Sequence, residues 1–206
     1  MIVRTIETPT HGRVLVEDRG ADRFLVGFHG YAESAETNLE QLETIPGIAG
    51  WNVASVQALH PFYTRSGSIV ASWMTSLDRE LAIADNVAYV RQVVEALGSP
   101  RTLVFLGFSQ GATMAARAAA YSANPAGLIL LGGDVPDEIR DDPAAVLPPM
   151  LLARGVRDEW YTDEKFKKDL NSLQGRTRVT PLVFEGGHEW TDEFRVAAAG
   201  FLGTVV

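Results

Sequence analysis

Short runs of apolar residues recur along the chain and alternate with longer segments of mixed character. Six such runs occur, at Phe24–Phe28, Asn52–Val56, Thr102–Leu106, Gly127–Leu131, Met150–Ala153 and Pro181–Phe184. A strand covered on both faces needs apolar side chains at nearly every position, whereas a half-exposed strand alternates apolar and polar residues. The runs therefore predict a mostly parallel sheet that is buried on both faces.

The segments between these runs have the character of helices. In Asp78–Leu97 the apolar residues recur at helical spacing, acidic residues come early, and Gly98 follows the end. We expect three further helices at Gln110–Tyr121, Thr162–Leu173 and Thr191–Leu202. Strands that alternate with helices predict an α/β fold with helices on both faces of the sheet. Ligands bind such sheets at the carboxyl ends of the strands.

The N-terminal segment has a different pattern. Ile2–Glu7 and Arg13–Asp18 alternate apolar and polar residues around a Pro- and Gly-containing turn, which predicts an antiparallel hairpin. Together with the apolar runs it brings the sheet to about eight strands. Only a short stretch separates Leu131 from Met150, too little for a large cap, so we expect one domain over residues 1–206.

Composition and charge narrow the classes of partner. The 206 residues include 18 basic and 26 acidic side chains, a net charge of -8, which argues against nucleic acid as a partner. The absence of cysteine excludes thiol nucleophiles, thiolate metal sites and disulfides. Met1–Thr10 lacks the apolar core of a signal peptide, and no run reaches the length of a membrane span. We therefore expect a cytoplasmic protein; a homodimer is compatible with the sequence, which does not decide the oligomeric state.

A serine between two glycines follows the run Thr102–Leu106. The pentapeptide Gly107-Phe108-Ser109-Gln110-Gly111 has the Gly-x-Ser-x-Gly spacing of a nucleophile elbow, a sharp strand-to-helix turn that presents a serine. The string alone is weakly specific, but the strand before it and the Ala-rich helix after it supply the required context. Ser109 is the candidate nucleophile, and a serine that only caps the helix is the alternative.

A serine hydroxyl needs a base to take its proton, and the candidates are His11, His29, His60 and His188. His188 directly follows the last apolar run, which is where the base of such a fold is found. Two glycines precede it and allow the loop to bring an imidazole over the serine. We therefore expect His188 to be the general base.

Two aspartates compete for the role of the acid that orients this histidine. Asp158 follows the run Met150–Ala153, and Asp134 follows Gly127–Leu131. Both positions can complete a triad in this architecture. We favour Asp158 because its strand immediately precedes the strand of the histidine.

The loop Phe28-His29-Gly30-Tyr31 follows the first buried run. There a backbone N–H is needed for the developing oxyanion, and the residue after the nucleophile provides the second. We expect these donors to be the N–H groups of Tyr31 and Gln110. His29 is expected to support the loop through hydrogen bonds, because no second metal ligand lies at helical or hairpin spacing from it.

These motifs resemble the α/β-hydrolase superfamily, and within it the small carboxylesterase and phospholipase group that includes acyl-protein thioesterases. The resemblance spans nearly the whole chain and rests on the segments Phe28–Gly30, Gly107–Gly111, Gly155–Asp158 and Gly187–His188. It implies cleavage of carboxylic esters or thioesters through an acyl-serine, without metal or cofactor. The chain departs from the group at Arg154, where a histidine is usual before the glycine.

Aromatic residues near the expected site suggest an apolar acyl pocket. We expect Trp73, Met74 and Trp160 to line it, with a small or lipid-like acyl ester or thioester as the substrate. The alternative is that these side chains belong to the core. Two other functions stay open: a hydrolase-fold binding protein without turnover, and a triad enzyme that acts on a C–C bond or transfers an acyl group.

Overall fold

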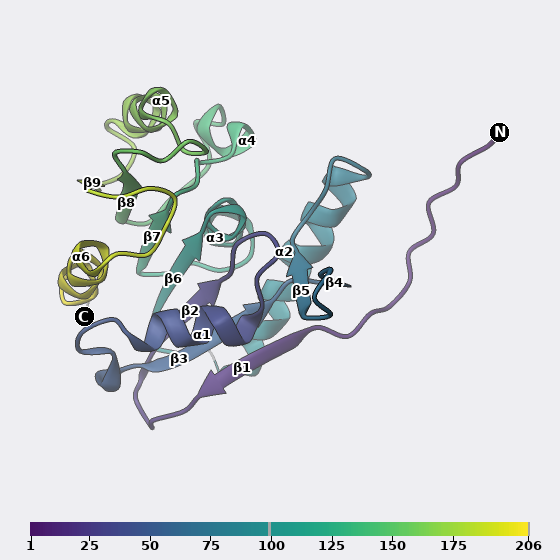
Figure 1. Cartoon of the computed structure of the whole chain (residues 1–206), viewed down its shortest axis with the longest axis horizontal. Coiled ribbons are helices and arrows are strands. Elements are labelled where there is room, and N and C mark those ends of the chain that lie inside the picture. Colours follow the sequence, from purple (N-terminus) through teal and green to yellow (C-terminus); the bar gives the residue numbers. More distant parts are fainter. Residues whose placement is uncertain (99, 206) are drawn as a thin grey trace.

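A seven-stranded sheet forms the centre of the molecule in the computed structural model, which describes residues 1–98 and 100–205 (Figure 1). Its strands lie in the order β1-β3-β2-β6-β7-β8-β9, and all except β1 run parallel to their neighbours. Their bounds are Arg13–Glu17 (β1), Arg23–Phe28 (β2), Asn52–Gln57 (β3), Thr102–Phe108 (β6), Gly127–Leu131 (β7), Met150–Gly155 (β8) and Val179–Phe184 (β9). The α/β class and the mostly parallel sheet predicted from the apolar runs are confirmed.

Successive residues of the central strands enter two separate cores. In β6, Leu103 and Phe105 join one core, while Val104 and Leu106 join the other. The first core is covered by α2 (Arg79–Ala96), α3 (Gln110–Tyr121), α4 (Asp137–Arg140) and α5 (Asp163–Leu173). The second is covered by α1 (Ala35–Glu43), a 3-10 turn (Ile48–Gly50) and α6 (Asp192–Leu202). Because side chains alternate between the faces of a strand, covering both faces makes every strand position apolar.

The four predicted helices are present, each end within one residue of its prediction. Thr162 and Thr191 lie just outside α5 and α6 as N-caps, where their hydroxyl oxygens accept N–H groups of the first turn. Within the residues that the structure describes, no helix combines the length and the apolar character needed to cross a membrane.

The predicted hairpin of Ile2–Glu7 with Arg13–Asp18 is wrong. Residues 1–12 form no strand, and they extend away from the body of the molecule (Figure 1). The apolar side chains of this segment are at least 78% exposed, so pairing there would bury no apolar surface. Arg13–Glu17 pairs instead with β3, whose six residues are all buried, and the sheet consequently has seven strands.

Of the elements that were not foreseen from the sequence, which include the one-turn α4 and the 3-10 turn, α1 and a two-stranded hairpin are the largest. Helix α1 carries few apolar residues on its inner face, because the buried Asn38 takes one position and donates to the Ser55 hydroxyl at 2.9 Å. The strands β4 (His60–Tyr63) and β5 (Ile69–Ser72) form a separate two-stranded hairpin. Three of the four residues of β4 are exposed to solvent. Neither element has the strong periodicity that identifies a segment from sequence alone.

The arrangement of strands gathers the expected site along one edge of the sheet. The chain passes from β2 to β3 on one side and then enters β6 on the other side of β2, so the order of strands reverses there. Ligands of open α/β sheets bind at such a reversal, at the carboxyl ends of the strands. The segments that follow β2, β6, β8 and β9 carry the predicted nucleophile, base, favoured acid and oxyanion donors.

Candidate active site

Ser109 lies in the sharp turn between β6 and α3. Its φ of 55° and ψ of −121° fall in a region that L-residues rarely occupy, as a nucleophile elbow requires. A Cβ on Gly107 would lie 2.2 Å from the carbonyl oxygen of Gly111, and a Cβ on Gly111 would lie 2.1 Å from that of Phe28. Only glycine fits at either position, which is the physical reason for the Gly-x-Ser-x-Gly spacing.

The imidazole of His188 connects Ser109 to Asp158. Its Nε2 lies 2.8 Å from Oγ of Ser109, and its Nδ1 lies 2.9 Å from Oδ2 of Asp158. A carboxylate only accepts, so Nδ1 carries the proton and Nε2 is left to accept from the serine hydroxyl. In the described residues this hydroxyl makes no capping bond to α3, which removes the alternative of a serine that serves only as a cap.

Asp158 is held by its own loop. Its side chain is 1% exposed, and Oδ1 accepts the backbone N–H groups of Trp160 and Tyr161 at 2.9 Å each. The second oxygen is thereby directed at His188. Of the two aspartates that the sequence left in competition, Asp158 forms this bond, and Asp134 forms none with His188 in the described part of the chain.

The loops after β7, β8 and β9 pack tightly around this hydrogen-bonded pair. A Cβ on Gly155 would lie 2.2 Å from the carbonyl oxygen of Gly187. Gly132 has a φ of +63°, and a Cβ there would lie 3.0 Å from Cε1 of His188. The histidine loop can approach the acid loop only because these positions lack side chains.

Arg154 explains one departure from the resemblance. It is 4% exposed, and its guanidinium donates to the carbonyl oxygens of Tyr161 (2.9 Å) and Val156 (3.2 Å). These carbonyls lie on the two sides of Asp158 in the chain. The arginine therefore holds the acid loop through two hydrogen bonds. The sequence does not reveal this role, because no motif marks it.

The expected oxyanion donors lie at adjoining chain segments. The contact of Gly111 with the end of β2 sets the first turn of α3 against the loop that carries Tyr31. Among the described residues, the N–H groups of Tyr31 and Gln110 have no protein acceptor. Gln110 is also the first residue of its helix, where the partial positive charge of the helix N-terminus favours an anion.

The side chain of Gln110 attaches the elbow to the segment after β5. Its Oε1 accepts from the backbone N–H of Trp73 at 2.8 Å, and its Nε2 donates to the carbonyl of Met74 at 2.9 Å. The Ser72 hydroxyl donates to the same Oε1 at 3.2 Å. The Ser-Gln pair of the motif thus has a structural reason, because the glutamine fixes the wall beside the nucleophile.

His29 supports the loop after β2, as expected. It is fully buried; its Nδ1 donates to the Gly30 carbonyl at 2.7 Å and its Nε2 accepts from the N–H of Ala58 at 3.0 Å. Burial lowers the pKa of His29, which keeps the ring neutral and suits this pair of bonds. Trp73 packs on the ring at 5.3 Å and donates its indole N–H to the His29 carbonyl at 2.8 Å.

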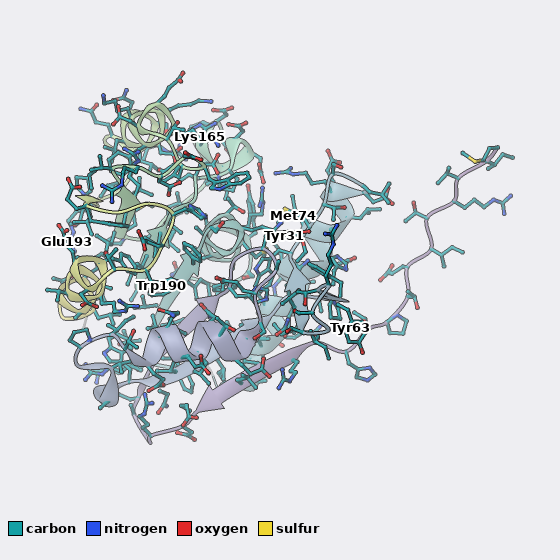
Figure 2. The ribbon with its side chains drawn as sticks, in the orientation of Figure 1. Tyr31, Tyr63, Met74, Lys165, Trp190 and Glu193 are labelled. Atoms are coloured by element: carbon teal, nitrogen blue, oxygen red, sulfur yellow. The ribbon has the colours of Figure 1, made fainter. Side chains whose placement is uncertain are left out.

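The three expected pocket residues have different surroundings. Trp73 has no exposed surface, so it cannot line a pocket open to solvent and belongs to the core. Met74 is 8% exposed and follows β5, on the side of the molecule near α2 (Figure 2). Trp160 is 73% exposed on the acid loop, and Trp190 lies on the opposite side near α6 (Figure 2).

Two cavities lie away from these residues. One of about 600 Å³ is lined by the end of α2 and residues 122–126, at the edge of the sheet opposite the triad side. The other, of about 550 Å³, is lined by residues at the start of β1 and the end of β3, such as Arg13 and Gln57. Neither is lined by Ser109, Asp158 or His188.

Glu33 is a carboxylate near the site that the sequence reading missed. Its Oε2 accepts the N–H of Gly30 at 2.6 Å. Burial raises the pKa of Glu33, while the Gly30 N–H and the nearby charge of His188 oppose that rise. A single acidic residue in a loop has no spacing pattern, and the proximity of Glu33 to the His-Gly segment was the available signal.

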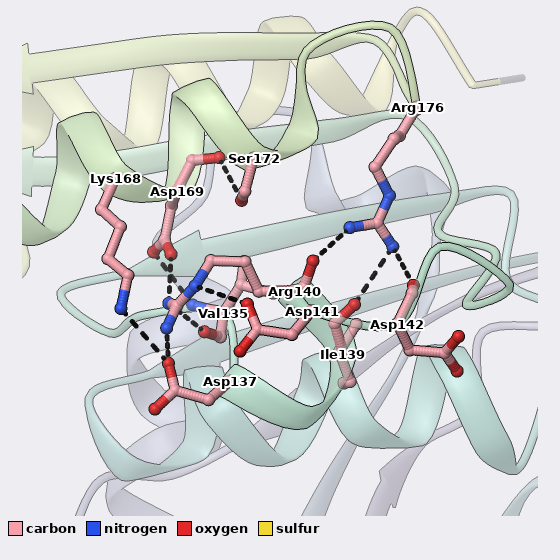
Figure 3. A network of polar contacts seen from close by, with 10 residues as sticks. All are labelled: Val135, Asp137, Ile139, Arg140, Asp141, Asp142, Lys168, Asp169, Ser172 and Arg176. Atoms are coloured by element: carbon pink, nitrogen blue, oxygen red, sulfur yellow. Dashed lines mark hydrogen bonds and ion pairs between the residues drawn. The ribbon is translucent and has the colours of Figure 1, made fainter.

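A network of polar contacts lies between α4 and α5 (Figure 3), and the hydroxyl of Tyr161 connects it to the acid loop. Asp169 is fully buried and accepts from Arg140 Nη1 (2.9 Å), the Val135 N–H (3.0 Å) and the Tyr161 hydroxyl (2.8 Å). Burial and the adjacent Asp169 carboxylate raise the pKa of Tyr161, so its hydroxyl stays protonated and donates. Arg176 donates to four backbone carbonyls that include those of residues 139 and 140.

The described residues contain no cluster of side chains that could bind a metal ion. Across residues 1–98 and 100–205, no three His, Asp or Glu side chains converge as metal ligands do. The polar groups of the site are the triad, the two free amides and Glu33.

Comparison with known proteins identifies a family for the chain. The model of a family described as "Serine hydrolase (FSH1)" matches residues 25–189, a range that includes Ser109, Asp158 and His188. A search of curated proteins by sequence gives no match.

Solved structures show the same fold at low sequence identity. The esterase PE8 is 20% identical with a TM-score of 0.78, and the match covers 95% of this chain and 98% of that one. A Bacillus cereus carboxylesterase is 15% identical (TM-score 0.72, 95% of each chain), and the Zea mays acyl-protein thioesterase 2 is 17% identical (TM-score 0.71, 95% and 99%). At these identities the similarity establishes the α/β-hydrolase fold.

Proposed function

The chain belongs to the FSH1 serine hydrolase family, and we propose that it hydrolyses carboxylic esters or thioesters through an acyl-enzyme on Ser109. The observation that carries this proposal is the pair of hydrogen bonds that joins Ser109 to His188 at 2.8 Å and His188 to Asp158 at 2.9 Å. A nucleophile, a base and an orienting acid in hydrogen-bond contact are what acyl transfer needs.

In the first half of the reaction Ser109 Oγ attacks the acyl carbon while His188 Nε2 takes the hydroxyl proton. Negative charge then develops on the former carbonyl oxygen, and the N–H groups of Tyr31 and Gln110 stabilise it. Collapse of this intermediate breaks the bond to the alcohol or thiol. His188 gives its proton to that leaving group, which leaves the acyl group on Ser109.

The second half repeats these steps with water. His188 takes a proton from a water molecule whose oxygen attacks the acyl carbon, and returns the proton to Ser109 Oγ as the acid product leaves. Asp158 keeps the imidazole in the tautomer with the proton on Nδ1 and stabilises the imidazolium in both halves. Because the base must be neutral, kcat/KM falls at acidic pH.

The proposed substrates are small or lipid-like acyl esters and thioesters. Support comes from apolar surface around the triad, where the rings of Tyr31 and Phe62 pack at 5.7 Å and Trp160 is exposed. The printed names of the similar structures include a carboxylesterase and a thioesterase, which is consistent with either bond type.

Hydrolysis of a panel of p-nitrophenyl esters and acyl thioesters of increasing chain length tests the proposal. We expect turnover by the wild type and a loss of about 10³-fold or more in Ser109→Ala. Turnover that survives in Ser109→Ala would overturn the assignment of the nucleophile. Absence of turnover on every ester and thioester would favour a binding protein, and acyl transfer to an added alcohol in preference to water would favour an acyltransferase.

A further inference from the structure

The carboxylate of Glu33 lies against the oxyanion loop. Its Oε2 accepts the Gly30 N–H at 2.6 Å, one residue before the amide of Tyr31. A Cβ on Gly30 would lie 3.0 Å from this Oε2 and 3.3 Å from Cδ1 of Phe108. The carboxylate and the Phe108 ring therefore flank the same face of Gly30. Phe108 in turn packs against the imidazole of His188, with ring centroids 4.9 Å apart.

The backbone at Glu33 is fixed on both sides. Its carbonyl oxygen accepts from Ala71 of β5 at 2.8 Å, and the preceding residue, Ala32, donates to the Ala71 carbonyl at 3.0 Å. Ala32 has a φ of 59°, so the loop turns sharply before Glu33. The bonds to β5 thus hold the backbone of Glu33, and the bond from the Gly30 N–H directs its side chain at the oxyanion loop.

The charged surroundings of this carboxylate are sparse. His188, from the loop after β9, is the titratable group whose charge acts on it, and Asp158 lies on the other side of that imidazole. His29, beneath the loop, is kept neutral by burial. Glu36 on α1 is paired with Arg13 at 2.6 Å. Within the described residues Glu33 has no ion-pair partner, and its negative charge is stabilised by the Gly30 N–H and by the charge of His188 when that ring is protonated.

We propose that Glu33 is a specificity-determining residue that disfavours substrates with a negative charge near the scissile carbonyl and favours neutral or cationic ones, while it also holds the oxyanion loop in place. This inference rests on the proposed hydrolysis at Ser109. A second anion placed beside an unpaired, partly buried carboxylate is repelled, and a cation is attracted, because the low local dielectric strengthens both interactions. The same charge stabilises the imidazolium that forms on His188.

Three p-nitrophenyl esters of similar length test the proposal: the neutral butyrate, the anionic succinate monoester and the cationic 4-(trimethylammonio)butyrate. The wild type is expected to rank them cationic, neutral, anionic in kcat/KM. Glu33→Gln keeps an acceptor oxygen for the Gly30 N–H but removes the charge. We expect it to reduce the ratio of neutral to anionic kcat/KM by about tenfold. The pH at which kcat/KM is half-maximal should also move lower, because the imidazolium loses a neighbouring anion.

Two further variants separate charge from positioning. Glu33→Asp keeps the charge on a shorter side chain that no longer reaches Gly30, so we expect a lower kcat with the charge preference retained. Glu36→Gln, an acid-to-amide change three residues away, should alter neither quantity. An unchanged ratio in Glu33→Gln would overturn the proposal even though hydrolysis proceeds. Absence of hydrolysis of all three esters by the wild type would instead overturn the proposed function, and this inference with it.

Discussion

The hydroxyl of Tyr161 donates a 2.8 Å hydrogen bond to the buried carboxylate of Asp169, and this bond joins helix α5 to the loop that positions Asp158. Tyr161 also donates its backbone N–H to Asp158 Oδ1 at 2.9 Å. Asp169 further holds the loop after β7 through the Val135 N–H. One carboxylate outside the triad therefore positions two of the loops that surround the histidine.

Removing the carboxylate of Asp169 should lower the free energy of unfolding much more than removing one of its hydrogen-bond partners. Asp169→Ala removes the buried counter-ion of Arg140, which keeps only the exposed Asp137 and Asp141 as anionic neighbours, and it removes the acceptor of Val135 and Tyr161. We expect a loss of about 3 kcal/mol in the free energy of unfolding. Tyr161→Phe removes one hydrogen bond and should cost about 1 kcal/mol. Urea unfolding followed by circular dichroism measures both. Equal losses in the two variants would contradict the role given to Asp169.

The strained backbone of Ser109 predicts an unusual order of stabilities. At φ 55° and ψ −121° a residue with a Cβ is disfavoured, whereas glycine adopts this conformation readily. Ser109→Gly should therefore be more stable to unfolding than Ser109→Ala by about 1 kcal/mol, although both lack the nucleophile. Thermal unfolding of the two inactive variants compares them directly, and an alanine variant at least as stable as the glycine variant would show that the turn is unstrained.

The choice between the two aspartates can be tested by matched amide variants. Asp158→Asn removes the acceptor that keeps the proton on Nδ1 of His188, and we expect kcat to fall by about 10⁴-fold. Asp134→Asn should change kcat by less than about threefold, since this side chain lies outside the hydrogen-bonded chain. The same ester assay reports both. A larger loss in Asp134→Asn than in Asp158→Asn would reassign the acid.

Burial of His29 predicts a pH dependence of stability. Its pKa is lower in the folded protein than the value of about 6.5 for an exposed histidine, so the folded state resists protonation. This residue therefore destabilises the fold as pH falls below about 6.5, and its contribution is constant above that value. Unfolding free energies between pH 5 and 8 should decline less steeply toward acid in His29→Gln than in the wild type. Parallel curves for the two proteins would mean that His29 titrates normally.

Much of the fold could be predicted because the central strands are buried on both faces, so nearly every residue in them is apolar. Residues such as Val104 and Phe105 enter opposite cores, and the resulting continuous apolar run is visible in the sequence. The alternating pattern of the N-terminal segment gave a wrong strand. Such a pattern forms a strand only where its apolar face packs on other residues, and Ile2 and Ile6 are exposed. Helix α1 was missed since its buried Asn38 interrupts the apolar pattern through a hydrogen bond to another strand.

Site residues could be predicted where the chemistry requires particular residues close together in the sequence. The glycines around Ser109 are required by contacts of about 2 Å that any side chain would make, so the elbow is visible as a string. Arg154, Asp169 and Glu33 act through contacts between distant segments, which leave no spacing in the chain. Trp73 was assigned to a pocket from its type and from the place of a tryptophan loop in the group that the chain resembles, and its buried indole instead supports His29.

The most direct test of the account is the reaction of the purified protein with a fluorophosphonate, read by intact mass. An activated serine displaces fluoride and gains one phosphonyl group, so the wild type should carry one adduct. Ser109→Ala and His188→Ala should carry none under the same conditions, while circular dichroism shows that both remain folded. An unlabelled wild type, or a Ser109→Ala variant that is labelled as fully as the wild type, would contradict the assignment of Ser109 as the nucleophile.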